Sequence, residues 1–286
     1  MLKVSALDPS SKATVALETI TPDLASRYLK LNRNNRHLRE GQVDRLIRDH
    51  LGDQFLFNGD TIVFGPSEDG GGEELFDGQH RLTMCVESSK PFIAIVVRGV
   101  ERAAKQTIDK TIRRSLGDEL QMAGYPNSLQ LGGILAYVHR AAIGRLSDRH
   151  PHTIQPTATE AFRLLRAYPE AVDAARKAAG NDVGEILAPS VYGFLWLGTH
   201  LQDPARAEGF CVPLISGENL QSGHPVYTLR RKLRSVRSES KHRTHASELA
   251  YALIAWSKFK ARRDLSTFPR DPFDPFPSVF DGLFAS

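Results

Sequence analysis

The segment 77–81 reads Asp-Gly-Gln-His-Arg, and these residue types can bind and process phosphate groups. It follows a short apolar stretch and begins a run with helical spacing, so we predict a buried strand that leads directly into a helix. The start of a helix attracts anions through its free N–H groups and the positive end of its dipole. His80 and Arg81 add side-chain donors, and Gly78 lets a ligand approach the backbone. With Asp77 available for a metal ion or a proton, the segment indicates a nucleotide polyphosphate as ligand.

The same five residues also fit an ordinary helix start. Asp77 is a good N-cap residue, Arg81 could lie on the surface, and His80 could pack against a sheet. Spacing alone does not separate this structural role from phosphate binding, so both interpretations stay open at this point.

Strand and helix patterns alternate up to about residue 125, and strand patterns nearly vanish after residue 127. The apolar and β-branched positions predict strands and helices, and Asn58-Gly59-Asp60 predicts a hairpin between extended pieces. Strands are expected at 15–20, 54–57, 61–64, 75–76 and 92–97, and helices at 22–32, 40–51, 78–88, from 101, near 116, and at 129–143, 158–168, 169–179, 189–201, 228–237 and 244–260.

These patterns predict an α+β protein with three parts. Residues 1–125 form a domain with a small mixed sheet and helices, and residues 126–265 form an all-helical domain. Residues 266–286 are a Pro/Phe-rich tail, which can be neither helix nor central strand and is expected to lie over the surface or to be disordered.

The composition is that of a soluble protein, with 41% hydrophobic and 24% charged residues among 286. No apolar run approaches the roughly 20 residues that span a bilayer, and the first residues do not resemble a signal peptide. We therefore expect a cytoplasmic protein without a membrane segment. The net charge of +4 permits a polyanionic partner but does not require one.

Segment 77–82 closely resembles the second conserved box of the ParB/sulfiredoxin superfamily. The resemblance covers residues 18–125. It includes a first box at 20–25, 32, 35–36 and 43–46, and segments at 57–62, 97–100, 108–109 and 113–115 that are similar to ParB-like proteins of phages and mobile elements. It implies a ParB/sulfiredoxin-like fold that binds a nucleoside triphosphate with Mg²⁺. The implied phosphate ligands are Gly78, Gln79, His80, Arg81, Arg36 and Asn35, the implied catalytic residues are Asp77 and His80, and Asp77 is the implied Mg²⁺ ligand.

Three departures from the superfamily limit the chemistry. Gln79 stands where sulfiredoxins have a nucleophilic cysteine, and Cys85 lies further along the helix, so sulfinic acid reduction is not expected. The Glu-Arg-Arg of ParB is absent, which argues against a CTP clamp. Thr111 replaces a glycine of the phage subgroup.

Several polar positions keep two interpretations. Asn58 and Asp60 are either turn residues or ligand contacts, and Asp109 and Arg114 are either an ion pair or part of the phosphate site. Asn35 either holds its loop or contacts the ligand. On helix 228–237 the basic residues form either a solvated face or a nucleic-acid contact; they are Arg230, Arg231, Arg234 and Arg237.

Three functions compete on these grounds. The first is a nucleotide-dependent phosphotransferase or NTPase, for which we expect Arg81→Ala to abolish nucleotide binding with the fold intact. The second is a DNA-binding regulator or partition-like protein with a nucleotide-switch domain. The third is a nuclease, for which the central motif offers only one carboxylate. A second copy of the chain, in a homodimer, is a further candidate partner.

Overall fold

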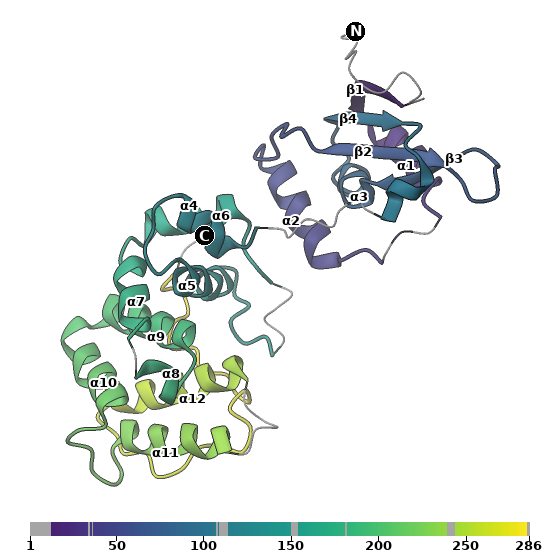
Figure 1. The fold of residues 1–286 in the computed structure, drawn as a ribbon. Helices are drawn as coiled ribbons and strands as arrows, with labels where there is room; N and C mark the ends of the chain where they lie inside the picture. Colours follow the sequence, from purple (N-terminus) through teal and green to yellow (C-terminus); the bar gives the residue numbers. More distant parts are fainter. Residues whose placement is uncertain are drawn as a thin grey trace. The chain divides into compact units, whose positions relative to one another are not determined.

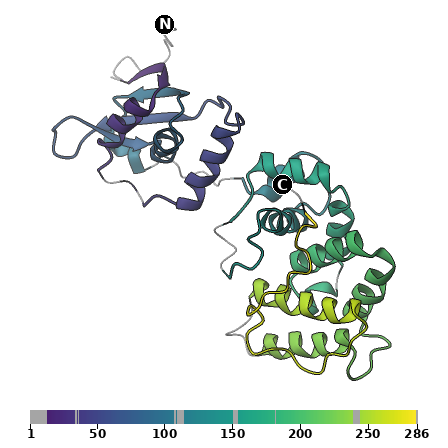
Figure 2. The same ribbon diagram turned by 180° about the vertical axis from the view of Figure 1, so that it is seen from behind.

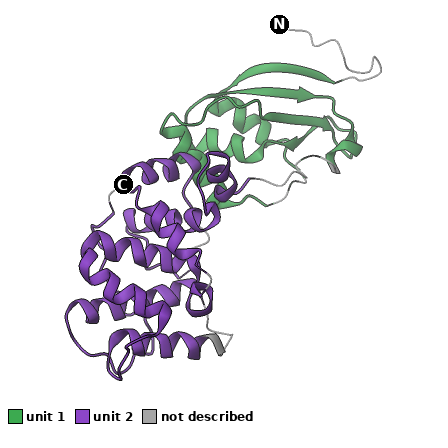
Figure 3. Cartoon of the chain, turned by 60° about the vertical axis from the view of Figure 1, so that its left-hand side comes forward, with its two compact units in different colours: residues 1–113 green, residues 114–286 purple. Residues whose placement is uncertain are grey.

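The computed structural model describes residues 13–33, 35, 37–106, 108, 114–149, 154–180, 182–238 and 244–284, and it shows an α+β chain (Figure 1). Figure 2 gives the same view from behind. The chain forms two compact units, residues 1–113 and 114–286 (Figure 3). The sequence analysis predicted this boundary near residue 125. In the structure the second unit begins earlier, and its first helix ends before that residue.

The N-terminal unit contains a four-stranded mixed sheet with the order β1-β4-β2-β3. Strand β4 pairs antiparallel with β1 and parallel with β2, while β2 pairs antiparallel with β3. The small mixed sheet expected from the sequence is therefore confirmed. The elements of this unit are β1 (Thr14–Ile20), α1 (Pro22–Leu29), α2 (Glu40–Leu51), β2 (Thr61–Pro66), β3 (Glu73–Asp77), α3 (Gln79–Ser88), β4 (Phe92–Arg98) and a 3-10 helix, η1 (Arg102–Gln106).

Helices α1 and α3 pack against one face of this sheet. The buried cluster on that face joins Tyr28 of α1 and Leu82 of α3 to Phe64 and Val96 of the strands. Thr21 caps α1, since its Oγ1 accepts a hydrogen bond of 3.2 Å from the N–H of Leu24. The other face of β1 and β4 leaves apolar side chains in solvent: Val15, Leu17 and Ile93.

The prediction of a hairpin around residues 58–60 is wrong. Residues 52–60 contain no strand, and β2 instead forms its hairpin with β3 through the loop 67–72. Asn58-Gly59-Asp60 makes a local turn, in which the N–H of Asp60 donates to Asn58 Oδ1 at 2.9 Å. The β-branched residues of β2 find buried partners in β3 and β4, whereas Leu56 and Phe57 stay exposed.

The C-terminal unit is helical in its described residues. Its elements are α4 (Leu116–Met122), α5 (Ser128–Ala142), α6 (Ala158–Ala167), α7 (Ala171–Ala178), α8 (Val183–Ile186), α9 (Pro189–Gln202), α10 (Pro204–Ser216), α11 (Pro225–Ser238) and α12 (His245–Lys260). Helices α11 and α12 lie side by side in Figures 1 and 2. The sequence missed α8 and α10; Pro213 lies inside α10, and an internal proline obscures a helical pattern. No helix of the described residues is long and apolar enough to cross a membrane.

The Pro/Phe-rich tail has no helix or strand in its described residues 266–284, as expected, and much of it is exposed, but two of its rings enter the core of this unit. Phe280 and Phe284 are buried, and their rings lie 5.6 and 5.4 Å from the ring of Phe194. The ring of Phe280 also occupies the space beside Gly198, where an added Cβ would lie 2.4 Å from it. The apolar rings outweigh the proline-rich composition, because burying them removes a large apolar area from water.

We expect Phe280→Ala to destabilise the C-terminal unit by about 3–5 kcal/mol, because the substitution opens a cavity in its core. Both tryptophans lie in this unit, so tryptophan fluorescence during urea unfolding reports on it directly. Val212→Ala, at an exposed position of α10, is the control and should change stability by less than about 0.5 kcal/mol. Equal effects of the two substitutions would contradict the docked tail.

Candidate functional site

Gly78 makes the turn from β3 into α3. Its backbone has φ 109° and ψ 0°, a left-handed conformation that favours glycine, and it occupies the N-cap position of α3. A Cβ on this residue would lie 3.1 Å from Cγ1 of the buried Ile62. Asp77, the N-cap of the structural interpretation, therefore does not cap the helix. The strand–glycine–helix element is as the sequence predicts.

Arg81 turns away from this helix start toward the strands. Its Nη2 donates to the carbonyl oxygen of Thr61 at 2.7 Å and to Asp77 Oδ2 at 3.2 Å, and its Nη1 lies 3.2 Å from Asp60 Oδ2. The side chain is only 12% exposed. Asn58 joins the group by donating to Asp60 Oδ2 at 3.2 Å. Arg81 thus ties the beginning of β2 to the end of β3, so Arg81→Ala should disturb the fold, contrary to the sequence-based expectation.

His80 and Gln79 are buried in the first turn of α3. The Nε2 atom of His80 accepts a hydrogen bond of 3.2 Å from the N–H of Arg39, the residue before α2. Because a backbone N–H can only donate, this hydrogen bond requires that Nε2 carries no proton. Gln79 Oε1 accepts from Asn32 Nδ2 at 2.9 Å. Both side chains therefore fix the segments around the helix start.

Asn35 holds its loop against β3. Its Nδ2 donates to the carbonyl oxygen of Leu75 at 2.8 Å, and in the same loop the carbonyl oxygen of Leu31 accepts from the N–H of Leu75 at 2.9 Å. The loop-holding role considered for Asn35 is thus present, and the residue also reaches the pocket at the start of α3.

A pocket of about 170 Å³ opens at the N-terminal end of α3. Its described lining consists of Asn35, Phe76, Asp77, Gln79, His80, Lys105 and Ile108. Four of these residues were site candidates in the sequence: Asn35, Asp77, Gln79 and His80. Arg81, a fifth candidate, does not belong to the described lining. Arg36 and Asp109 lie outside the described residues, and Arg114 is an exposed residue of the C-terminal unit.

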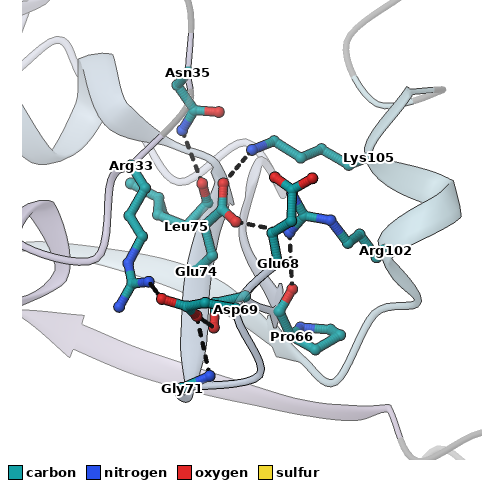
Figure 4. A network of polar contacts seen from close by, with 11 residues as sticks. Arg33, Asn35, Pro66, Glu68, Asp69, Gly71, Glu74, Leu75, Arg102 and Lys105 are labelled. Atoms are coloured by element: carbon teal, nitrogen blue, oxygen red, sulfur yellow. Dashed lines mark hydrogen bonds and ion pairs between the residues drawn. The ribbon is translucent and has the colours of Figure 1, made fainter.

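Lys105 and the buried Glu74 are the functional candidates that the sequence did not reveal (Figure 4). Glu74 is 1% exposed; its Oε1 accepts from Lys105 Nζ, and its Oε2 accepts from Arg102 Nη1 at 2.8 Å. Burial raises the pKa of Glu74, but the hydrogen bonds from the two cations outweigh this and leave it below its ordinary value of 4.5. Lys105 also lies 5.2 Å from the centre of the Phe76 ring.

The carboxylates of Asp60, Glu74 and Asp77 are paired with cations. Among the described residues, no group of three or more His, Cys, Asp or Glu side chains could hold a metal ion. Asp77 shares Arg81 with Asp60, so an ion bound by Asp77 would compete with a guanidinium. The described residues therefore do not form a site that fits Mg²⁺ by themselves.

Cys85 is buried against the sheet. Burial raises the pKa of its thiol to about 11, and Sγ lies 3.4 Å from the carbonyl oxygen of Ile20. A thiol that stays protonated is a poor nucleophile.

The basic residues of α11 divide into two groups. Arg230 donates to the carbonyl oxygens of Leu214 and, at 2.7 Å, Ile215, so it closes the end of α10. Arg231 and Arg234 are exposed. The side chain of Arg237 lies outside the described residues.

No protein-family model, curated protein or solved structure matches the chain. The resemblance to the ParB/sulfiredoxin superfamily therefore rests on the residues of the sequence.

We expect Gly78→Ala to destabilise the N-terminal unit by about 1–3 kcal/mol, because the residue combines a left-handed backbone with a close approach to Ile62. Gly70→Ala is the matched control: its φ is 68°, but nothing lies within 4 Å of the added Cβ. Urea unfolding followed by circular dichroism should show the larger loss for Gly78→Ala. The reverse order would contradict the packing of this turn.

We expect Glu74→Gln to lower the free energy of unfolding by roughly 1–3 kcal/mol at pH 7, because charge-assisted hydrogen bonds are lost. The pKa of Glu74 is depressed in the folded state, so its contribution is complete above its ordinary value of 4.5 and is lost as the pH falls below it. The difference between wild type and variant should therefore shrink from pH 5 toward pH 3 in urea titrations. A difference that is independent of pH would show that the Glu74 charge does not stabilise the fold.

Proposed function

We propose that the N-terminal unit binds the phosphate groups of a nucleotide in the pocket at the start of α3. The observation that carries this proposal is the convergence of Asn35, Gln79, His80 and Lys105 on that helix start. A helix N-terminus favours anions, and a lysine beside it adds a compact positive charge. The small pocket fits phosphoryl groups in size and chemistry.

The resemblance of segment 77–82 to the phosphate box of the ParB/sulfiredoxin superfamily supports the same proposal. In that superfamily the box contacts a nucleoside triphosphate, and a similar form, Asp-Gly-His-His-Arg, occurs in kinases that act on free serine. Transfer or hydrolysis of a phosphoryl group by this chain would use Asp77 and His80, the residues beside the pocket. Release of inorganic phosphate from ATP would test this catalytic step separately from binding.

Mg²⁺ would reach this site with the phosphates of a nucleotide. Mg²⁺ commonly keeps several water ligands and binds through substrate phosphates and one or two carboxylates. Asp77 is the carboxylate of the described lining, and Arg81 already holds it. The phosphate oxygens would therefore supply most of the ligands.

The C-terminal unit favours a second function, nucleic-acid binding. Helix α11 buries its apolar side and exposes Arg231 and Arg234, and charges of this kind can neutralise DNA phosphates. Gel shifts at several salt concentrations test it, and binding that is absent at the lowest salt would exclude it. No feature of the described residues favours a nuclease.

We expect isothermal titration calorimetry to detect binding of ATP, ADP or CTP in the presence of Mg²⁺. Gln79→Glu should weaken it roughly tenfold or more, because a negative charge next to a phosphate costs on the order of 1–4 kcal/mol. The substituted side chain keeps an oxygen that can accept from Asn32.

Gln54→Glu is the control, since Gln54 is exposed and does not line the pocket. It should leave the affinity unchanged, and circular dichroism should show both variants folded. Absence of heat with every nucleotide would refute phosphate binding by this unit.

A further inference from the structure

Lys105 is the one permanently positive residue in the described lining of the pocket. Asp77 contributes the opposite charge, and His80 is neutral while it accepts from Arg39. Arg81, the cation that the sequence assigned to the phosphate, is bound to the carbonyl oxygen of Thr61 and to the carboxylates of Asp60 and Asp77, and it is not part of the described lining. An anion in this pocket would therefore meet Lys105.

Glu74 fixes the ammonium group of Lys105 at this position. Lys105 follows Arg102 by three positions on η1, so both side chains reach the same buried carboxylate. The Lys105 side chain is 18% exposed and lies against the Phe76 ring. An ammonium group has three N–H donors, and the hydrogen bond shown here, to Glu74, uses one of them. Lys105 can thus keep its buried partner and still donate to a ligand.

The size of the pocket limits what it can enclose. Sites that enclose a drug-sized ligand measure about 300–1,000 Å³, whereas this pocket measures about 170 Å³. A cavity of roughly 150 Å³ holds a molecule the size of benzene. One or two phosphoryl groups fit this space, and a complete nucleoside triphosphate does not.

We infer that Lys105 recognises the terminal phosphate of a nucleoside triphosphate or of inorganic tripolyphosphate, while the base and ribose stay outside the pocket. Glu74 is its positioning residue. This inference rests on the proposed phosphate-binding function and deepens it in two ways. The recognising cation is Lys105 rather than Arg81, and the site discriminates little between bases.

Calorimetry with tripolyphosphate, ATP and CTP tests the inference on the full chain. Wild type should bind the three with affinities within about fivefold of one another, a difference of roughly 1 kcal/mol. Lys105→Gln should weaken tripolyphosphate binding by roughly tenfold to a hundredfold, the range of one charge-assisted hydrogen bond.

Lys90→Gln is the matched control. Lys90 is also an ion-paired lysine of this unit, with Asp53, but it does not line the pocket. Its substitution should leave the affinity unchanged. An equal affinity of Lys105→Gln and wild type would overturn the role of Lys105, and ATP binding without tripolyphosphate binding would overturn the ligand class. Wild type that binds none of the three would refute the proposed function itself.

A double variant separates recognition from folding. Lys105→Gln alone leaves Glu74 with only Arg102, whereas Glu74→Gln with Lys105→Gln removes both charges of the pair. The double variant should fold and bind as weakly as Lys105→Gln. If Glu74 acts through Lys105, Glu74→Gln weakens binding in wild type but not in the Lys105→Gln background. Equal losses in both backgrounds would overturn the positioning role.

Discussion

A carboxylate inside the N-terminal unit, that of Glu74, sets the arrangement around the pocket. A buried charge is costly unless cations and hydrogen bonds compensate it, and two cations of η1 do so here. This pairing holds η1 beside β3, although Lys105 lies 31 positions after Glu74 along the chain. It brings Lys105 to the start of α3, next to the turn at Gly78. The electrostatics of the core and the chemistry of the pocket therefore depend on one pair of residues.

Another cation of the region, Arg81, is held by the fold and is not part of the described pocket lining. Its planar guanidinium suits several acceptors at once, and it contacts the carboxylates of Asp60 and Asp77 and a backbone oxygen of β2. Those contacts fix the strands from which the pocket is built. Arg81 thus stabilises the fold, whereas Lys105 lines the pocket and is the residue that we propose to contact the phosphate. A lysine suits that place because its ammonium is a compact charge with several donors.

The sequence predicted the local parts of this arrangement. The apolar strand, Gly78 and the helical spacing after it identified the β3–α3 element, because each depends on neighbouring residues only. The Glu74–Lys105 pair could not be predicted in this way, since it depends on how β3 and η1 meet in space. The prediction of a hairpin at 58–60 was wrong because a strong turn signal does not determine which strands pair with each other. The docked tail was missed because prolines hid the two phenylalanines that anchor it, Phe280 and Phe284.

The central claim is that phosphate binds at the start of α3. The most direct measurement is a series of ¹H–¹⁵N correlation spectra of the full chain during titration with tripolyphosphate. Direct binding predicts that the amide signals of Gly78, Gln79, His80 and Lys105 shift together and saturate with one affinity. Signals that stay unchanged at these residues, while others shift or none do, would contradict the account.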